Sequence, residues 1–453
     1  MKLHLKSVSN RLTESFASLR MLRRIVYVGL FSALGGISAT SALANNDLEL
    51  SLMESEAIAI ALRDNPNLAQ IRARFDAMSE VPSQVGTLPD PTISFNAMNL
   101  PTNSFDLDQE PMTQLQIGFS QMIPFPGKLS LKEEAAEFDA VAAKHTLEEV
   151  TSQLRRQVSA KWWQVHYLDR ALETVKRNQA LLRQFITVAE TKYETGKGLQ
   201  QDVLLAQLEL SKLLDQEIRL GSMRRTQVIA LNILMDRLPN QTISIPTETD
   251  TTMPVLKPEG ELHALARELR AKLMQMHSNV DAAQSRLKLA KRNLYPDFMV
   301  GMNYGDRSGT NPLPRGGDRE DFASLMVGIK VPLYAGRKQK KAISQRRSEL
   351  ERSQHALRDE EGVVLGQVSK ALTDYETARD QFALFERGII PQAEQTVQSM
   401  LAGYQVNEVD FLNLVRSQVT LFNYELQYWK ALSDANQSLA RLKAAVGEES
   451  LYE

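Results

Sequence analysis

Two stretches of this chain carry the same pattern of apolar positions, at steps of three and four residues. Seven apolar positions in 154–175 coincide, at an offset of 210, with seven positions in 364–385. This spacing places apolar side chains along one face of an α-helix. Further upstream the offset is 208, where Pro124 corresponds to Pro332. The chain therefore uses one long architectural unit twice.

The longest helical segments run from Ser130 to about Lys192 and from Lys338 to about Ala402. At 1.5 Å per residue, the first would form a rod of roughly 95 Å. Return helices are predicted at 201–234 and 411–446. Because a lone rod would expose its apolar stripe, we expect the two rods to pack side by side as coiled coils.

Shorter helices are predicted ahead of each rod. Residues 52–80 have helical spacing that is broken at Asn65-Pro66, and residues 259–293 correspond to them in the second half. The three tryptophans, Trp162, Trp163 and Trp429, are expected to fill the core or grooves between helices.

Between the short helices and each rod, the period of the pattern changes to two. Residues 92–100 and 114–123 alternate apolar and polar side chains, as do 298–304 and 324–331. This alternation predicts two β-hairpins with long polar tips. It suits a barrel wall between lipid and water, and equally a small soluble sheet packed on helices. Four strands cannot close a barrel, so the membrane alternative requires oligomerisation, and three chains would supply twelve strands.

A distinctive turn joins each rod to its return helix. Gly196 follows Tyr193, and Asn407 follows Tyr404 at the same distance. Gly, and next Asn, are the residues that best adopt the left-handed conformation at a helix C-terminus. Asp202 and the equivalent region around Asp410 then lie near the starts of the return helices, where carboxylates suit the helix dipole.

Composition removes several kinds of site. The chain has no cysteine and six scattered histidines, so thiolate chemistry is excluded and a transition-metal site is not expected. The N-terminus has a basic leader, an apolar run from Ile25 to about Thr40, and Ala42-Leu43-Ala44. We interpret 1–44 as a signal peptide cleaved after Ala44, rather than an uncleaved anchor helix. The mature net charge of −7 does not favour a nucleic-acid partner.

The duplicated turns, the Asn65-Pro66-x-Leu68 start and the proline turns after the hairpins resemble the TolC-like outer-membrane efflux factor family over nearly all of 45–453. Gln207 and Gln418 downstream of the turns belong to the same likeness. Within that family, Leu88–Pro91, Pro124–Lys128 and Gly198–Leu204 are similar to the heavy-metal branch, the CzcC-like and CusC-like components.

The resemblance implies a homotrimer in outer-membrane lipid, with four transmembrane strands per chain in a twelve-stranded barrel and a long coiled-coil helical tunnel in the periplasm. It implies a periplasmic adaptor protein and an inner-membrane RND-type pump as partners, and passive conduction without cofactors. The expected organisation is a signal peptide at 1–44, a first efflux repeat at 45–250 and a second at 251–453. The hairpins are placed at about 92–123 and 297–331, and the long helical hairpins at about 128–236 and 338–446.

The resemblance also places candidate sites. The periplasmic aperture is assigned to Asp202, Asp410, Asn413 and Arg416. Family members often carry acidic residues at the positions of Asn413 and Arg416. Narrowing of the aperture by a ring of carboxylates at these positions is therefore in doubt here. Adaptor docking is assigned to the helical turns, at Gly196, Lys197, Gly198, Asn407 and Glu408. The alternatives are solvated helix starts and simple helix caps.

Three function classes remain open. The first is an efflux channel for heavy-metal cations, and the second is the same channel for organic drugs or type I protein secretion. The third is a periplasmic structural coiled-coil protein. No nucleophile, metal cluster or phosphate loop suggests an enzyme. Because no N-terminal cysteine is present, the mature protein is expected to be unlipidated.

Overall fold

The computed structural model describes residues 51–452, which belong to one structural unit. The predicted signal peptide, with Ala42 and Ala44, lies outside the described residues. The helices of the first half are α2 (Glu54–Asp64), α3 (Pro66–Ser79), α4 (Val81–Gly86), α5 (Lys128–Glu194) and α6 (Gln200–Leu234). Those of the second half are α7 (Glu259–Leu269), α8 (Ala271–Arg292), α9 (Gln339–Leu384), the π-helical η1 (Phe385–Ile389), α10 (Ile390–Gln405) and α11 (Phe411–Val446).

The strands β1 (Thr92–Met98), β2 (Gln114–Ile123), β3 (Asp297–Asp306) and β4 (Phe322–Lys330) form one antiparallel sheet in that order. Both predicted hairpins are confirmed, and the pairing of β2 with β3 joins the two halves. The register aligns apolar side chains in rows across all four strands. One such row is Ile93, Phe119, Met302 and Leu325, and the next is Phe95, Ile117, Tyr304 and Ala323.

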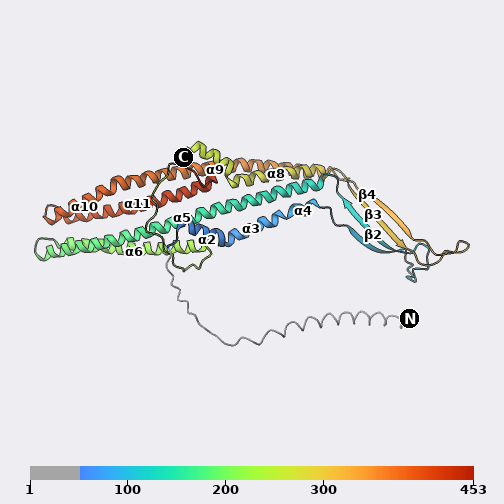
Figure 1. The fold of residues 1–453 in the computed structure, drawn as a ribbon, viewed down its shortest axis with the longest axis horizontal. Helices are drawn as coiled ribbons and strands as arrows, with labels where there is room; N and C mark the ends of the chain where they lie inside the picture. Colours follow the sequence, from blue (N-terminus) through green and yellow to red (C-terminus); the bar gives the residue numbers. More distant parts are fainter. Residues whose placement is uncertain (1–50, 453) are drawn as a thin grey trace, which may run out of the picture. The chain divides into compact units, whose positions relative to one another are not determined.

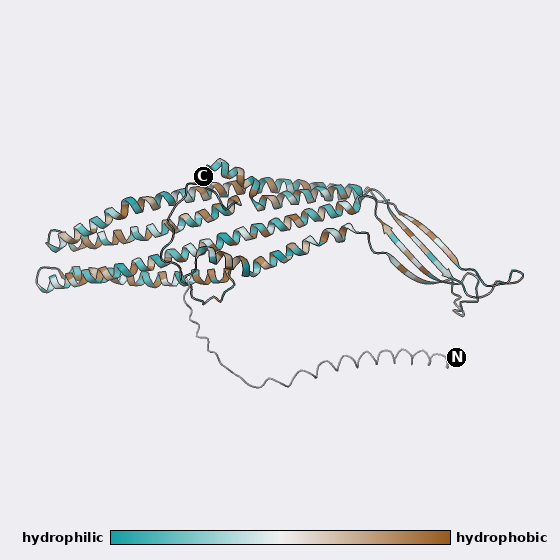
Figure 2. Ribbon diagram, in the orientation of Figure 1, coloured by the Kyte–Doolittle hydropathy of each residue, from teal (hydrophilic) through white to brown (hydrophobic). Residues whose placement is uncertain are grey.

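In the described residues, no helix lies across either face of this sheet (Figure 1). The alternative of a soluble sheet packed on helices is therefore wrong. The apolar face stays open: Phe95, Leu325 and Val327 are 78%, 79% and 68% exposed. Hydrophobic residues alternate with polar ones along the strands (Figure 2). The sheet accordingly has an apolar face and two edges that nothing in residues 51–452 covers.

The first rod is confirmed, since α5 runs unbroken for 67 residues. The second rod is also continuous, but it consists of three consecutive elements, α9, η1 and α10. Pro391 lies in the first turn of α10 and has no N–H to donate to the preceding turn, and the π-helical η1 lies directly before it. None of the helices described between residues 51 and 452 has the length and apolarity needed to cross a membrane.

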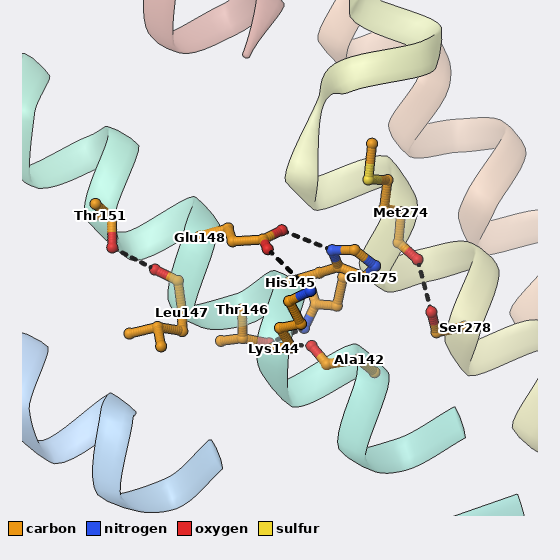
Figure 3. A network of polar contacts seen from close by, with 10 residues as sticks. All are labelled: Ala142, Lys144, His145, Thr146, Leu147, Glu148, Thr151, Met274, Gln275 and Ser278. Atoms are coloured by element: carbon orange, nitrogen blue, oxygen red, sulfur yellow. Dashed lines mark hydrogen bonds and ion pairs between the residues drawn. The ribbon is translucent and has the colours of Figure 1, made fainter. Parts of the chain in front are cut away.

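The expected side-by-side packing of the two rods is wrong. α5 packs against α8 and α11, and each of these packs against α9, so two helices separate the rods. A rod 67 residues long needs several partners in succession to cover its stripe. Polar contacts also join α5 to α8, where Gln275 Nε2 donates to Thr146 Oγ1 at 2.8 Å (Figure 3).

Residues 259–293, predicted as the helical counterpart of 52–80, form two helices, because the chain breaks at Arg270 between α7 and α8. This break mirrors the one at Asn65, whose side chain caps α3 by accepting from Leu68 N–H at 3.1 Å. The C-terminal end of α11 packs against the break at Arg270. A Cβ on Gly447 would lie 2.7 Å from the Leu269 carbonyl oxygen.

The tryptophans lie in the core as predicted. Trp162 and Trp163 are buried, and their Nε1 atoms donate to Leu52 O at 2.8 Å and to Glu54 Oε2 at 3.0 Å. Trp429 packs, partly buried, against the same cluster. These bonds fix the start of α2 on the middle of α5.

Candidate functional site

The two helical turns have the same backbone structure. Gly196 and Asn407 adopt positive φ angles of 72° and 66°, as the sequence predicted. The N–H of Lys197 donates to Lys192 O at 2.8 Å, and that of Glu408 donates to Gly403 O at 2.9 Å. This six-to-one bond is the Schellman motif that ends a helix on a left-handed residue.

Large and small residues exchange places between the two turns. In the first turn a Cβ on Gly198 would lie 2.9 Å from Lys192 Cβ. At the corresponding positions of the second turn, a Cβ on Gly403 would lie 2.6 Å from Val409 Cγ2. Each turn therefore has room for only one side chain at these two positions. The first turn has Lys192 with Gly198, and the second has Gly403 with Val409. A packing requirement accounts for Gly198.

Lys192 connects the two turns. Its ammonium group donates to Asn407 Oδ1 at 2.8 Å and to the Tyr404 carbonyl oxygen, and it lies 4.0 Å from the centre of the Tyr404 ring. A cation held over an aromatic face and bonded to two oxygens is favourable. The ends of the two helical hairpins are thus joined by one side chain from the first repeat. We call the residues Lys192, Tyr404 and Asn407 the tip latch.

Asp202 and Asp410 come together beside the tip latch. Burial raises the pKa of the Asp202 carboxyl, and the negative charge of Asp410 raises it further, while Lys192 opposes the rise. Burial also raises the pKa of the Tyr404 hydroxyl, and Asp202 adds to that rise. The carboxylates and the lysine therefore belong to one electrostatic group.

The remaining predicted residues lie around this group. Asp410 directly precedes α11, and the N–H of Asn413 donates to its carbonyl oxygen at 3.1 Å. Arg416 lies one turn further on an exposed face of α11, while Lys197 and Glu408 are exposed in the turns. Within residues 51–452, no three His, Asp or Glu side chains are arranged to hold a metal ion.

Sequence reasoning missed Lys192 and the role of Tyr404. The duplication singled out Tyr404 as the equivalent of Tyr193, but it did not show which side chain contacts either tyrosine. A signal was present at the preceding position, where Lys192 corresponds to Gly403. A long cation in one repeat and no side chain in the other indicates an asymmetric contact between the two turns.

The outer membrane efflux protein family matches residues 57–235 and 262–448, which are most of the chain. The outer membrane protein TolC of Vibrio cholerae is 20% identical over 390 residues, covering 85% of this chain and 89% of TolC.

Two solved structures illustrate the likeness of fold. The outer membrane protein VceC of Vibrio cholerae has a TM-score of 0.73 at 18% identity, covering 88% of this chain and 97% of VceC. CusC, whose structures concern transmembrane channel formation, has a TM-score of 0.73 at 15% identity, covering 88% of this chain and 93% of CusC. Together with the four-stranded sheet and the long helices, these confirm the predicted fold class.

Proposed function

The chain belongs to the outer membrane efflux protein family, and from this premise we propose that it is the outer-membrane channel of a tripartite efflux system. Its two halves, 45–250 and 251–453, act as two efflux repeats, and 1–44 is the export signal. The mature protein carries no lipid. A periplasmic adaptor and an inner-membrane RND-type pump deliver the substrate, which the channel conducts passively.

The open sheet carries this proposal. Its apolar face and its two edge strands, β1 and β4, have no partner in the described residues of this chain. Unpaired backbone groups and exposed apolar rows are unfavourable in water, and unpaired edges are unfavourable in lipid. Three copies joined edge to edge would close twelve strands into a barrel with the apolar rows facing lipid.

The internal repeat predicts the register in which β4 of one copy would pair with β1 of the next. Within the chain, Phe119 of β2 lies opposite Met302 of β3. The offset of 208 converts Phe119 to Val327, and the offset of 207 between Asp90 and Asp297 converts Met302 to Phe95. We therefore expect Val327 of one copy to lie opposite Phe95 of the next. The same rule pairs Ile329 with Ile93, so apolar residues again meet apolar residues.

An ion pair follows from the same symmetry. Lys128 of the first repeat binds Asp297 of the second at 2.7 Å. Gly127-Lys128 corresponds to Gly336-Arg337 at an offset of 209, and Asp90 corresponds to Asp297 at 207. Arg337 and Asp90 are both exposed. We expect Arg337 of one copy to pair with Asp90 of its neighbour in the trimer.

The turns at the far end of the long helices then form the periplasmic aperture and the adaptor-docking surface. In a trimer, Asp202, Asp410, Asn413 and Arg416 each occur three times around one axis, where like charges crowd. The tip latch holds the two hairpins of each copy together. Gly196, Lys197, Gly198, Asn407 and Glu408 present the helical turns to the adaptor.

Lys192→Met is expected to loosen the aperture. The substitution removes two hydrogen bonds and a cation–aromatic contact at a partly exposed position, worth about 1–2 kcal/mol. That loss corresponds to a shift of about 5–30-fold in the ratio of closed to open tips. Single-channel recording of the purified protein in planar bilayers measures it as higher mean conductance. Lys197→Met is the matched control, because Lys197 is an exposed lysine of the same turn. Equal conductance in the two variants would contradict the latch.

Heavy-metal cations are the proposed substrate. The support is the likeness of Leu88–Pro91, Pro124–Lys128 and Gly198–Leu204 to the heavy-metal branch. CusC supports the fold alone at its low identity. Organic drugs or a secreted polypeptide are the alternative cargo for the same channel.

Growth of a deletion strain tests the substrate. The strain should become sensitive to one or more of zinc, cobalt, cadmium, nickel, copper and silver, and the intact gene should restore resistance. Dyes and detergents serve as the parallel panel. Sensitivity to dyes and detergents alone would move the protein to the organic-compound alternative and leave the channel proposal standing.

A further inference from the structure

A charged cavity lies where α11 ends and α8 begins, between α5 and α9. Its volume is about 520 Å³, within the usual range for small-molecule pockets. Its acidic lining residues are Glu149, Glu360 and Asp374. Its basic lining residues are Arg156, Arg270, Lys272, Lys370 and Arg441. The lining therefore carries two more positive charges than negative ones.

Arg270 is the buried member of this set. Its side chain is 5% exposed, and its Nη2 donates to Glu149 Oε1 at 2.8 Å. Its Nε and Nη1 atoms are buried and have no hydrogen-bond partner among the described residues. Unpaired N–H groups on a buried guanidinium are costly, so such groups usually have a partner.

The arginines repel one another. Burial lowers the pKa of Arg156, and the positive charge of Arg441 lowers it further. Burial likewise lowers the pKa of Arg270, where Glu149 and Glu360 oppose the change and Arg156 adds to it. Guanidinium groups stay charged in proteins. Glu149 pairs with Arg270, and Asp374 lies 3.6 Å from Arg441, so the carboxylates of the lining offset part of this repulsion. An anion placed in the cavity would offset the positive charge that remains.

The start of α8 also favours an anion. α8 begins at Ala271, between Arg270 and Lys272, so the positive end of a 22-residue helix lies at the cavity. On α9, Lys370 and Asp374 line the cavity, whereas Ser369 faces His263 of α7 at 3.0 Å. The site therefore lies on a different face of α9 from the one that α7 covers.

We propose that this cavity binds a small oxyanion with two negative charges, of the phosphate or dicarboxylate class. The guanidinium groups suit the paired oxygens of either anion. The site lies near the middle of the long helices, away from the tip latch and the sheet, so it does not depend on either.

Titration calorimetry of the full-length mature protein in detergent tests this site, with inorganic phosphate and succinate in separate runs. Sodium chloride of equal ionic strength is the reference for non-specific screening. We expect saturable binding of one anion per chain, and about tenfold weaker binding for Lys370→Gln, which removes one charge from the exposed rim. The matched control is Arg387→Gln on η1, whose side chain is 83% exposed and does not line the cavity.

The two anions distinguish the ligand classes. Binding of phosphate alone would assign the site to phosphates, and binding of succinate alone would assign it to dicarboxylates. Absence of saturable binding by both anions would overturn the proposal. Binding that is equally strong in wild type, Lys370→Gln and Arg441→Gln would also overturn it, because the anion would then lie elsewhere.

Discussion

Replacing Lys128 with Met should destabilise the protein by about 3–5 kcal/mol, the usual cost of removing one partner from a buried ion pair. The Lys128 side chain is 7% exposed, and its Nζ lies 2.7 Å from Asp297 Oδ1 and 2.9 Å from Tyr295 O. Asp297 Oδ1 also accepts from the N–H of Phe125 at 2.9 Å. The Lys128 side chain thereby joins the place where β2 leads into α5 to the place where α8 leads into β3.

The urea midpoint of the purified protein measures this effect, with Lys340→Met as the control on the exposed start of α9. The control should change stability by less than about 0.5 kcal/mol. The double variant Lys128→Met, Asp297→Asn should cost less than the sum of the single variants, since neither then leaves an unpaired partner. A midpoint for Lys128→Met equal to that of the control would show that the pair contributes nothing.

Cysteines at Val327 and Phe95 should join neighbouring copies covalently, almost completely for the trimer proposed above and not at all for a monomer. The natural chain has no cysteine, so there is no background. A bond within one chain is out of reach, because β1 and β4 are the outer strands of a four-stranded sheet and lie roughly 14 Å apart. Oxidation followed by denaturing electrophoresis measures the products, which should be linked dimers and trimers.

The register makes the cross-linking test specific. Directly opposed side chains on antiparallel strands have Cβ atoms about 4.5–5.5 Å apart, which a disulfide or a short thiol cross-linker spans. Val327→Cys with Ser94→Cys is the matched control, because Ser94 is one residue away and faces the opposite side of the sheet. Equal linkage in the two pairs would reject the register, and no linkage in either would reject edge-to-edge assembly.

Much of the fold follows from local pattern. The rods, the return helices and the hairpins were each visible as a change of period, because one buried face imposes a period of 3.6 on a helix and two on a strand. The left-handed residues Gly196 and Asn407 were predicted from their residue type and shared position. The break at Asn65-Pro66 was visible because proline and an N-capping asparagine mark it.

The break at Arg270 was invisible because neither proline nor glycine stands there. The chain turns at this point where α11 meets it at Gly447, and Arg270 is buried against Glu149, 121 positions earlier. The tip latch could not be predicted for the same reason, because Lys192 contacts residues that lie 212 and 215 positions further along the chain.

By itself, the sequence determined that one unit of long helices and a hairpin occurs twice, which residues cap its turns, and where its apolar faces lie. These properties depend on neighbours a few positions apart, which periodicity and residue type report directly. Only the tertiary structure decided that α8 and α11 separate the two rods, that Lys128 binds Asp297, and that five basic residues line one cavity. Those contacts join positions far apart in the sequence, 169 residues apart for Lys128 and Asp297, and their energies depend on burial and charge that no local pattern records.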